Sequence, residues 1–578
     1  MRTAALFALV AALVVIPAPA QAHDRADGFA GLSALGVDGT TGGAAGQTVT
    51  VDNQADLERY ATAAEPYVIR VKGSIAMEPY GKEVEVASDK SIVGDGAGAE
   101  IVHGGFFLNG VHNVIIRNLT IRDSYVPGDW DGKSKDYDGV QMDGAHHVWI
   151  DHNHFTRTGD GLLDIRKDSD YVTVSWNVFS DHNKAVGVGW TANVVTKVTF
   201  HHNWIRGTHQ RNASIDNTEA AHWYNNYVQD TATYGTMIRG GGRLVVENSY
   251  YRNVPDPIVV KDPASQAVQR GNVFRDSPGR NDSAGAAFDP SSYYAYRLDP
   301  AERVPGIVTR GAGPQGRARP APRRLTVALD GTGDFASIQA ALGAAPRGAV
   351  ITVKPGVYRE MPRLWPGAGD VTIKGETGDP ADVVVTYDLA AEAEKFYGGP
   401  WGAAQSATFS VQADGVTIRD LTFTNTAATS GHAVRTSGDR TAFDGTAFAG
   451  AYQADGHRAH LRDCQATGPV RGQGTTVLDG CTIRSAGPGA VITGGTVLVS
   501  ASRLEGDADV ALGNAGQVVV RDSWLGAHIK DDPWEGEGRY AEYRNTGPGA
   551  SINADRPQLT DRQAREHTAA SYLRGWRP

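Results

Sequence analysis

The sequence predicts an all-β protein built from two right-handed parallel β-helices in tandem. A phrase of about ten residues, in which apolar residues surround an asparagine, recurs roughly every 22–26 residues in the first half of the chain. Each phrase alternates with a period of two, as in Val-Thr-Val-Ser-Trp, which indicates strands rather than helices. Such strands bury their apolar side chains only when coils stack, so the repeats predict a solenoid.

The asparagine of each phrase is expected to form a ladder along the first solenoid, because stacked amides can hydrogen-bond from coil to coil. The aligned positions are Asn118, Asn153, Asn177, Asn203, Asn226 and Asn248. Less regular phrases from DVTIKGET to VVVRDSWLGA, spaced by roughly 16–24 residues, extend the prediction to the second half.

The N-terminus has the pattern of a secretory signal peptide. Met1 and Arg2 precede an apolar run from Ala4 to Ile16, and small residues follow up to Ala22. The run is too short to span a bilayer comfortably. We therefore expect a signal peptide over residues 1–22, cleavage after Ala22, and a secreted, extracellular protein without a membrane partner.

The length of 578 residues favours two domains. A stretch rich in Gly, Pro and Arg, residues 304–324, has almost no apolar periodicity and predicts a flexible or extended linker. The expected domains are residues 23–303 and 325–578. We expect the protein to be a monomer.

The formal net charge of −10 argues against a nucleic-acid partner, because phosphates would be repelled. The two cysteines, Cys464 and Cys481, lie in the second half, and in an oxidising compartment they could form one disulfide.

Four aspartates gather on consecutive coils of the first solenoid. Asp136 and Asp138 belong to DYDGVQMDG, and Asp160 and Asp164 belong to DGLLDIRKDSD one coil later. Because stacked coils lie about 4.8 Å apart, these carboxylates are expected to approach one another. Oxygen ligands of this kind favour calcium. The alternative is that they only solvate turns, and the residues alone leave both interpretations open.

Eight histidines in the same region do not predict a zinc site, because they alternate in and out along strands and show no tight metal-ligand spacing. We expect structural or surface-lining roles for them. They are His146, His147, His152, His154, His182, His201, His202 and His222.

The first half resembles the pectate lyases of the large β-helical polysaccharide lyase family. The phrases VWIDHNHF, DGLLDI, SDYVTVSWNVFSDHNK, VTFHHNWIRGTHQRN and AHWYNNYV carry the resemblance, which covers nearly all of residues 28–275. It implies calcium-dependent cleavage of α-1,4-polygalacturonate, the unmethylated form of pectin, by β-elimination. The implied Ca²⁺ ligands are Asp138, Asp160 and Asp164, with Asp136 as a fourth.

The resemblance also implies roles for two cations. Lys184 matches the lysine that holds a substrate carboxylate, and Arg211 matches the catalytic arginine. Because an arginine ordinarily stays protonated, using one as a base predicts an alkaline activity optimum. Asp216 stands where many pectate lyases carry a second arginine. Arg206 and Arg239 are candidate substitutes, and the sequence does not choose between them.

The second half resembles pectin methylesterases from TVALDGTGDFASIQAAL to YAEYRNTGPGA, but its site positions differ. Gln453 is kept, and Asp455 is a displaced candidate for the acid. His432 replaces a glutamine, Arg471 stands at the nucleophile, and Asn514 replaces an arginine. These changes imply a catalytically degenerate domain retained for binding pectin.

Two alternatives stay open. One is a bifunctional enzyme that demethylates pectin and then cleaves it, which methanol release would reveal. The other is a non-enzymatic β-helical carbohydrate-binding protein, which would have no reason to keep Lys184 and Arg211 together with the four aspartates.

Overall fold

The structure is a computed structural model that describes residues 25–315, 323–427, 431–485, 489–507 and 509–578. The predicted signal peptide, residues 1–22, lies outside the described residues, as does the part of the predicted linker from 316 to 322.

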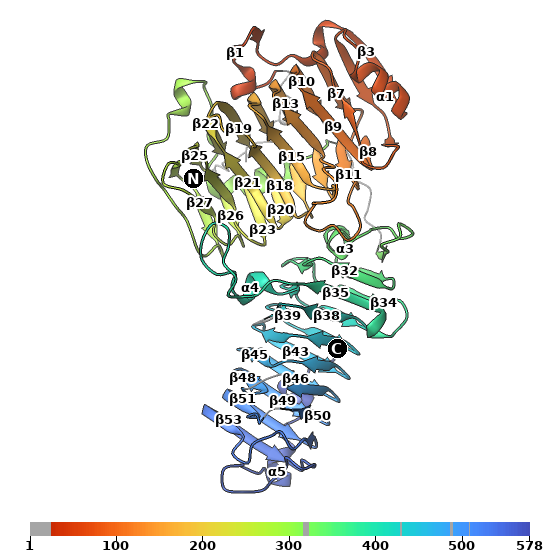
Figure 1. Ribbon diagram of the computed structural model, residues 1–578, viewed down its shortest axis with the longest axis vertical. Coiled ribbons are helices and arrows are strands. Elements are labelled where there is room, and N and C mark those ends of the chain that lie inside the picture. Colours follow the sequence, from red (N-terminus) through yellow and green to blue (C-terminus); the bar gives the residue numbers. More distant parts are fainter. Residues whose placement is uncertain (1–24, 316–322, 428–430, 486–488, 508) are drawn as a thin grey trace, which may run out of the picture.

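The first half is a parallel solenoid of three sheets, to each of which successive coils contribute one strand (Figure 1). Sheet I contains β3 (Gln47–Val51), β4 (Tyr67–Val71), β7 (Lys90–Gly94), β10 (His112–Arg117), β13 (His146–Asp151), β16 (Asp170–Ser175), β19 (Thr196–His201), β22 (Thr218–Tyr224), β25 (Arg243–Glu247) and β28 (Gln266–Arg270). Sheet II contains β5 (Ser74–Ala76), β8 (Glu100–Val102), β11 (Thr120–Arg122), β14 (His154–Thr156), β17 (Val178–Ser180), β20 (Trp204–Thr208), β23 (Tyr227–Thr231), β26 (Tyr250–Arg252) and β29 (Val273–Arg275). Sheet III contains β6 (Lys82–Glu85), β9 (Gly104–Asn109), β12 (Val140–Asp143), β15 (Gly161–Arg166), β18 (Lys184–Gly189), β21 (Gln210–Asp216), β24 (Thr236–Arg239) and β27 (Ile258–Val260).

The second half is also a parallel solenoid, which confirms the predicted tandem β-helices. The first arm of sheet IV contains β30 (Arg324–Val327), β31 (Val350–Val353), β34 (Thr372–Gly375), β37 (Thr417–Arg419), β40 (Thr441–Asp444), β43 (Arg458–Arg462), β46 (Thr475–Asp479) and β49 (Thr496–Ser500). Its second arm contains β33 (Arg363–Leu364), β36 (Phe409–Val411), β39 (His432–Thr436), β42 (Ala451–Ala454), β45 (Val470–Gly472) and β48 (Ile492–Thr493). The long strand β51 (Gly513–Arg521) joins the two arms and pairs with β53 (Trp534–Tyr543). Sheet V contains β32 (Gly356–Arg359), β35 (Val383–Tyr387), β38 (Thr422–Asn425), β41 (Ala447–Ala449), β44 (Gln465–Thr467), β47 (Thr482–Ser485), β50 (Arg503–Gly506) and β52 (Trp524–Leu525).

Apolar side chains fill the interior of each solenoid. In sheet I, Val114, Val148, Val172 and Val198 occupy one register row, and all four are fully buried. The helix α1 (Gln54–Ala61) packs Leu57 into the same core. Stacking therefore gives each coil the apolar contacts that it lacks alone.

The asparagine ladder forms over four of its six predicted positions. The side-chain oxygens of Asn177, Asn203 and Asn226 each accept from the backbone N–H of the ladder asparagine one coil earlier, at 2.9–3.0 Å. The prediction for Asn118 and Asn248 was wrong by one residue, because the ladder continues through Leu119 at one end and Ser249 at the other.

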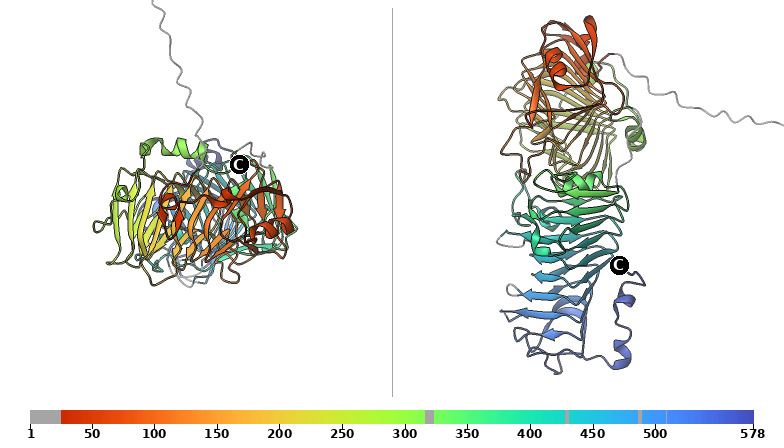
Figure 2. Two further views of the ribbon diagram at one scale, coloured as in Figure 1. Left: turned by 90° about the horizontal axis from the view of Figure 1, so that it is seen from above. Right: turned by 90° about the vertical axis from the view of Figure 1, so that its right-hand side faces the viewer.

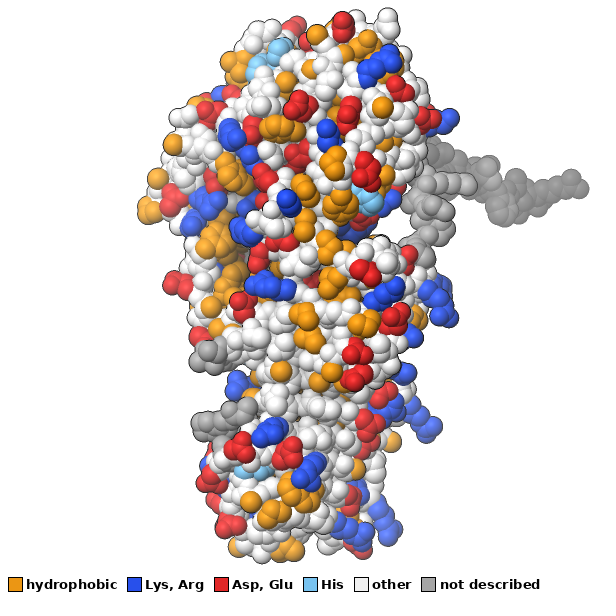
Figure 3. Space-filling model, turned by 45° about the vertical axis from the view of Figure 1, so that its right-hand side comes forward, with side chains coloured by type: hydrophobic (Ala, Val, Ile, Leu, Met, Phe, Trp, Pro, Cys, Tyr) orange, Lys and Arg blue, Asp and Glu red, His pale blue; other side chains and the backbone are white. Residues whose placement is uncertain are grey.

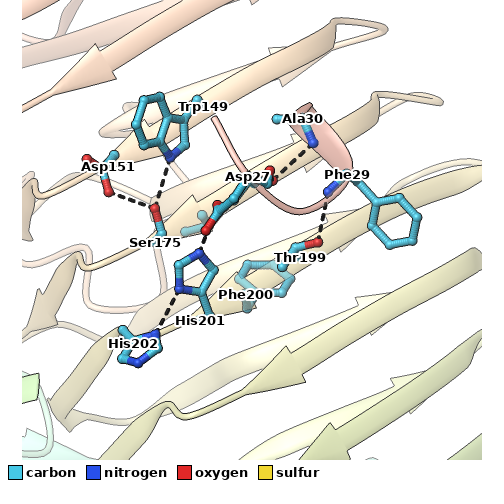
Figure 4. A network of polar contacts seen from close by, with 12 residues as sticks. Asp27, Phe29, Ala30, Trp149, Asp151, Ser175, Thr199, Phe200, His201 and His202 are labelled. Carbon is cyan, nitrogen blue, oxygen red and sulfur yellow. Dashed lines mark hydrogen bonds and ion pairs between the residues drawn. The ribbon is translucent and has the colours of Figure 1, made fainter. Parts of the chain in front are cut away.

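The N-terminal segment lies across sheet I and uses some of the histidines (Figure 4). His201 contacts Asp27 at 3.0 Å through Nε2 and His202 at 2.9 Å through Nδ1. The backbone N–H groups of Phe29 and Ala30 donate to threonine hydroxyls of the same sheet. Strand-borne histidines here hold a surface segment in place.

The predicted extended linker is corrected over its first part, which is the helix α2 (Val304–Gly311). Val304 and Val308 are four residues apart, so they share one helix face and pack on Tyr227. That contact stabilises a helix in a stretch where Gly and Pro favour an irregular chain.

The two solenoids cross. In Figure 1 the coils of the first follow one another across the picture and those of the second follow one another down it, and Figure 2 shows the same arrangement from two other sides. The first coils of the second solenoid, including α3 (Ile338–Ala344), pack on turns that lead from sheet II to sheet III. The contacts include Arg359 with Asp131 at 3.0 Å, His209 with the Met361 carbonyl at 2.9 Å, and Lys395 with Asp256 at 2.7 Å.

The predicted disulfide is wrong: Cys464 and Cys481 are free, buried thiols. Their sulfurs lie 3.3 Å from the carbonyl oxygens of Arg462 and Leu461, respectively, inside the second core. The remaining helices are α4 (Gly402–Ser406), α5 (Asp561–Ala564) and α6 (Ala569–Tyr572). In the described part of the chain, no helix has the length and apolar character that crossing a membrane requires.

Candidate active site on sheet III

The predicted aspartates meet at the edge of sheet III. Asp136 and Asp138 precede β12, and Asp160 precedes β15 on the next coil. Carboxylate oxygens of these three residues lie within 4.8 Å of one another. Asp138 is fully buried, whereas Asp136 is exposed and pairs with Arg166 at 3.0 Å.

Asp164 lies on β15 beside this group, and its side chain is buried. Its Oδ1 has no hydrogen-bond partner among the described residues, and its Oδ2 lies 3.8 Å from Nη1 of Arg211. An acceptor that is buried without a partner is costly, which indicates that a cation or ligand belongs there.

The negative charges of the clustered carboxylates repel one another. Burial, and then the neighbouring Asp164, hold the pKa of Asp138 well above its usual range. Burial raises the pKa of Asp164 to about 7, although the Arg211 guanidinium lowers it. Oxygen-only ligands with this mutual repulsion fit a hard divalent cation, which would restore the ionised forms.

Lys184 and Arg211 join the cluster from the next two coils. Lys184 begins β18, is buried, and donates from Nζ to Asp160 and, at 3.4 Å, to the Gly132 carbonyl. Arg211 lies on β21, with its guanidinium 5.1 Å from the ring centre of Trp190. The six predicted site residues are therefore brought together on one sheet.

Sequence reasoning missed three neighbours. Glu83 on β6 accepts from the Asp138 backbone N–H at 2.8 Å, and burial raises its pKa to about 8. Gln141, with its amide nitrogen toward Asp138, donates to it at 3.0 Å. Trp190 is 46% exposed and lies beside Arg211, and no sequence pattern marks it as a site residue.

The structure separates the two candidates for the missing arginine. Arg239 lies on β24 of sheet III and pairs with Asp216 itself. Arg206 lies on sheet II, where it pairs with Asp181 at 3.4 Å. Of the two, only Arg239 shares the sheet of the site.

In the second solenoid, the altered positions form part of a row on the second arm of sheet IV. Strand register aligns Gln453, Arg471 and Asn514 along this row, with His432 on the neighbouring β39. Asp455 does not stand free as an acid, because it pairs with Arg435 at 2.8 Å and accepts from Gln453 at 2.7 Å.

Comparison with known proteins agrees with this geometry. The model of the pectate lyase family matches residues 2–315, and that of the pectinesterase family matches residues 324–505. The chain belongs to the pectate lyase family. It is a polysaccharide lyase that carries a second, pectinesterase-type domain.

Individual pectate lyases share the first half of the chain. A pectate trisaccharide-lyase of Thermotoga sp. (strain RQ2) is 35% identical over an alignment of 344 residues, which covers 51% of this chain and 90% of that protein. One from Bacillus licheniformis is 33% identical over an alignment of 305 residues, which covers 50% of this chain and 85% of that protein.

Solved structures of pectate lyases and of pectin methylesterases are also similar to part of the chain. A pectate lyase from Bacillus sp. N165 in complex with trigalacturonate has 27% identity and a TM-score of 0.43, covering 50% of this chain and 98% of its own. A pectin methylesterase from Erwinia chrysanthemi has 22% identity and a TM-score of 0.39, covering 44% and 97%.

Proposed function

We propose that the chain is a secreted, calcium-dependent pectate lyase that cleaves α-1,4-polygalacturonate by β-elimination into unsaturated oligogalacturonides. The observation that supports it is the aspartate cluster on sheet III, with a buried lysine and an arginine beside it. The names of the pectate trisaccharide-lyases point to the same substrate class.

The chemistry follows from these groups. Calcium held by Asp136, Asp138, Asp160 and Asp164 would neutralise a galacturonate carboxylate and acidify the adjacent C5 proton. Arg211 accepts that proton, the C4–oxygen bond breaks and a C4–C5 double bond forms. The departing oxygen takes up a proton and becomes the new reducing-end hydroxyl, so no water is consumed overall.

Lys184 places a buried ammonium where negative charge develops on the substrate carboxylate, which stabilises the intermediate. Asp164 Oδ2 lies 3.8 Å from Nη1 of Arg211, so the carboxylate holds the guanidinium at the edge of the aspartate cluster.

Calcium dependence is tested by assaying cleavage of polygalacturonate after chelation and after re-addition of Ca²⁺. We expect activity to disappear and then return. In Asp138→Asn, half-maximal activity should require on the order of 10-fold more Ca²⁺, because a buried ligand is lost. Asp168→Asn, an exposed residue outside the cluster, is the matched control. Full activity in chelator would refute the metal assignment.

We propose that the second domain lacks esterase activity and binds pectin. Arg471 at the nucleophile position and the pairing of Asp455 with Arg435 support this proposal. A role in binding explains why the fold persists while the catalytic groups do not.

Secretion is proposed from residues 1–22. N-terminal sequencing of protein recovered from the culture medium should begin at His23. Recovery only from cells, with Met1 retained, would contradict it.

A further inference from the structure

A cavity of about 420 Å³ lies between the two solenoids, away from the aspartate cluster. The turns after β23 and β26 line it from the first domain, and residues of β33, α4 and β39 line it from the second. This volume falls in the range of small-ligand pockets.

Arg363 is the unusual residue of this cavity. Its side chain is fully buried, and Nη1 and Nη2 donate to the carbonyl oxygens of Ala404 at 3.1 Å and Gln405 at 2.7 Å. Its Nε has no partner, and no carboxylate in the described residues pairs with it. Burial, and then Arg435, lower its pKa to about 9, so the guanidinium is still charged at neutral pH.

A buried cation without a counter-ion is costly, and a bound carboxylate would supply one. Two N–H groups of Arg363 are used by carbonyls, and the guanidinium carries five, so Nε and its neighbours remain available to an anion.

A second arginine projects from the same row of strands. Register aligns Arg363 with Ser410 and Ser410 with Arg435, so the two arginines lie two coils apart, with Cα atoms about 10 Å from each other. Arg435 is 18% exposed and donates from Nε to Asp455, and its other donors have no partner among the described residues. Two long side chains can reach one anion across that separation.

The other lining groups suit a sugar. Gln412 accepts from Asn253 at 2.9 Å, which leaves its amide N–H groups to donate. Trp401 adds an aromatic surface. The remaining lining charges are Lys395, which Asp256 neutralises at 2.7 Å, and the exposed Asp276 at the rim.

We propose that this cavity binds one galacturonate residue of pectate, with its carboxylate between Arg363 and Arg435 and its ring beside Trp401. The choice of galacturonate rests on the proposed function. The site belongs to both domains, so it ties the second solenoid to the substrate of the first.

The test is isothermal titration calorimetry of digalacturonate into the full chain, with Lys184→Ala and Arg211→Ala and in chelator, so that the site on sheet III neither binds nor turns over. We expect binding, and no binding of the neutral dimethyl ester. Arg363→Met and Arg435→Met should each weaken affinity roughly 10- to 100-fold, because each removes charge-assisted hydrogen bonds. Arg471→Met, two coils further along the row, should leave it unchanged.

Equal affinity for acid and ester, or an affinity that neither substitution changes, would overturn the proposal. So would an absence of binding. If Arg363→Met does not unfold cooperatively, the proposal is tested with Arg435→Met and Trp401→Ala instead. Both residues are partly exposed, and each substitution should weaken binding of digalacturonate. Failure of the lyase function is recognised independently, by the products of the unsubstituted protein.

Discussion

Arg211 is the residue on which the proposed chemistry depends. It lies between Asp164, whose Oδ2 is 3.8 Å from Nη1, and the Trp190 ring, whose centre is 5.1 Å from the guanidinium. A planar guanidinium can be held in this way by a carboxylate and an aromatic face, whereas a lysine ammonium is a flexible point charge.

Arg211→Lys should therefore lower kcat on polygalacturonate by roughly 10²- to 10⁴-fold, the usual effect of losing a general base, with little change in KM. Arg275→Lys, at an exposed position on sheet II, is the control and should keep normal kinetics. Substantial activity in Arg211→Lys would show that the arginine only pairs with substrate.

Part of the site could be predicted from the residues alone, because the four aspartates stand on consecutive coils. Lys184 and Arg211 were predicted from the resemblance to pectate lyases, and the structure brings them beside the aspartates. Glu83 could not be predicted, since it reaches the cluster from β6, two coils before β12 and 55 residues before Asp138.

At the scale of elements, the turn before α4 crosses from the second solenoid to sheet III. Tyr397 of this turn is buried with Tyr234, Met237 and Val259, and its ring centre is 5.3 Å from that of Tyr234. The Asn212 side chain, next to Arg211 on β21, donates to the Tyr234 carbonyl oxygen at 2.9 Å. A second-domain aromatic therefore packs against a residue that is bonded to the strand carrying Arg211.

Tyr397→Ala should lower kcat on polygalacturonate about 10-fold and leave KM nearly unchanged, because small displacements of a catalytic group are costly. Tyr397→Phe keeps the ring and loses only the 3.1 Å hydrogen bond to Asp256, so it should restore most of the rate. Unchanged kinetics in Tyr397→Ala, with normal thermal unfolding, would show that the contact serves packing alone.

Strands could be predicted where apolar and polar residues clearly alternate. The prediction failed where tertiary contacts decide the secondary structure. The helix α2 forms in a Gly/Pro-rich stretch because Val304 and Val308 pack against Tyr227, a residue far away in sequence. The ladder positions predicted at Asn118 and Asn248 were wrong by one residue. Aligning the phrases by their asparagines does not show which residue of each turn faces inward.

At the scale of the whole molecule, a lyase domain and a pectinesterase-type domain are both built from stacked parallel β coils. Figure 3 shows acidic and basic side chains interspersed over both solenoids on the face that it draws. On that face there is no single-sign surface, so the proposed recognition of substrate relies on local groups, the aspartate cluster and the arginine pair.

The full chain should release no methanol from methyl-esterified pectin above the level without enzyme, because Arg471 cannot serve as the nucleophile that an aspartate provides. An Arg471→Asp variant provides a comparison at the same position. Methanol release by the unsubstituted chain, measured under conditions where its lyase is active, would establish the bifunctional alternative.

The central claim is that polygalacturonate is cleaved by elimination on sheet III. The most direct measurement compares ultraviolet absorbance of the products with the number of new reducing ends, for the full chain with Ca²⁺. We predict one absorbing C4–C5 double bond for each new reducing end. Reducing ends that accumulate without absorbance would mean hydrolysis, and would contradict the account.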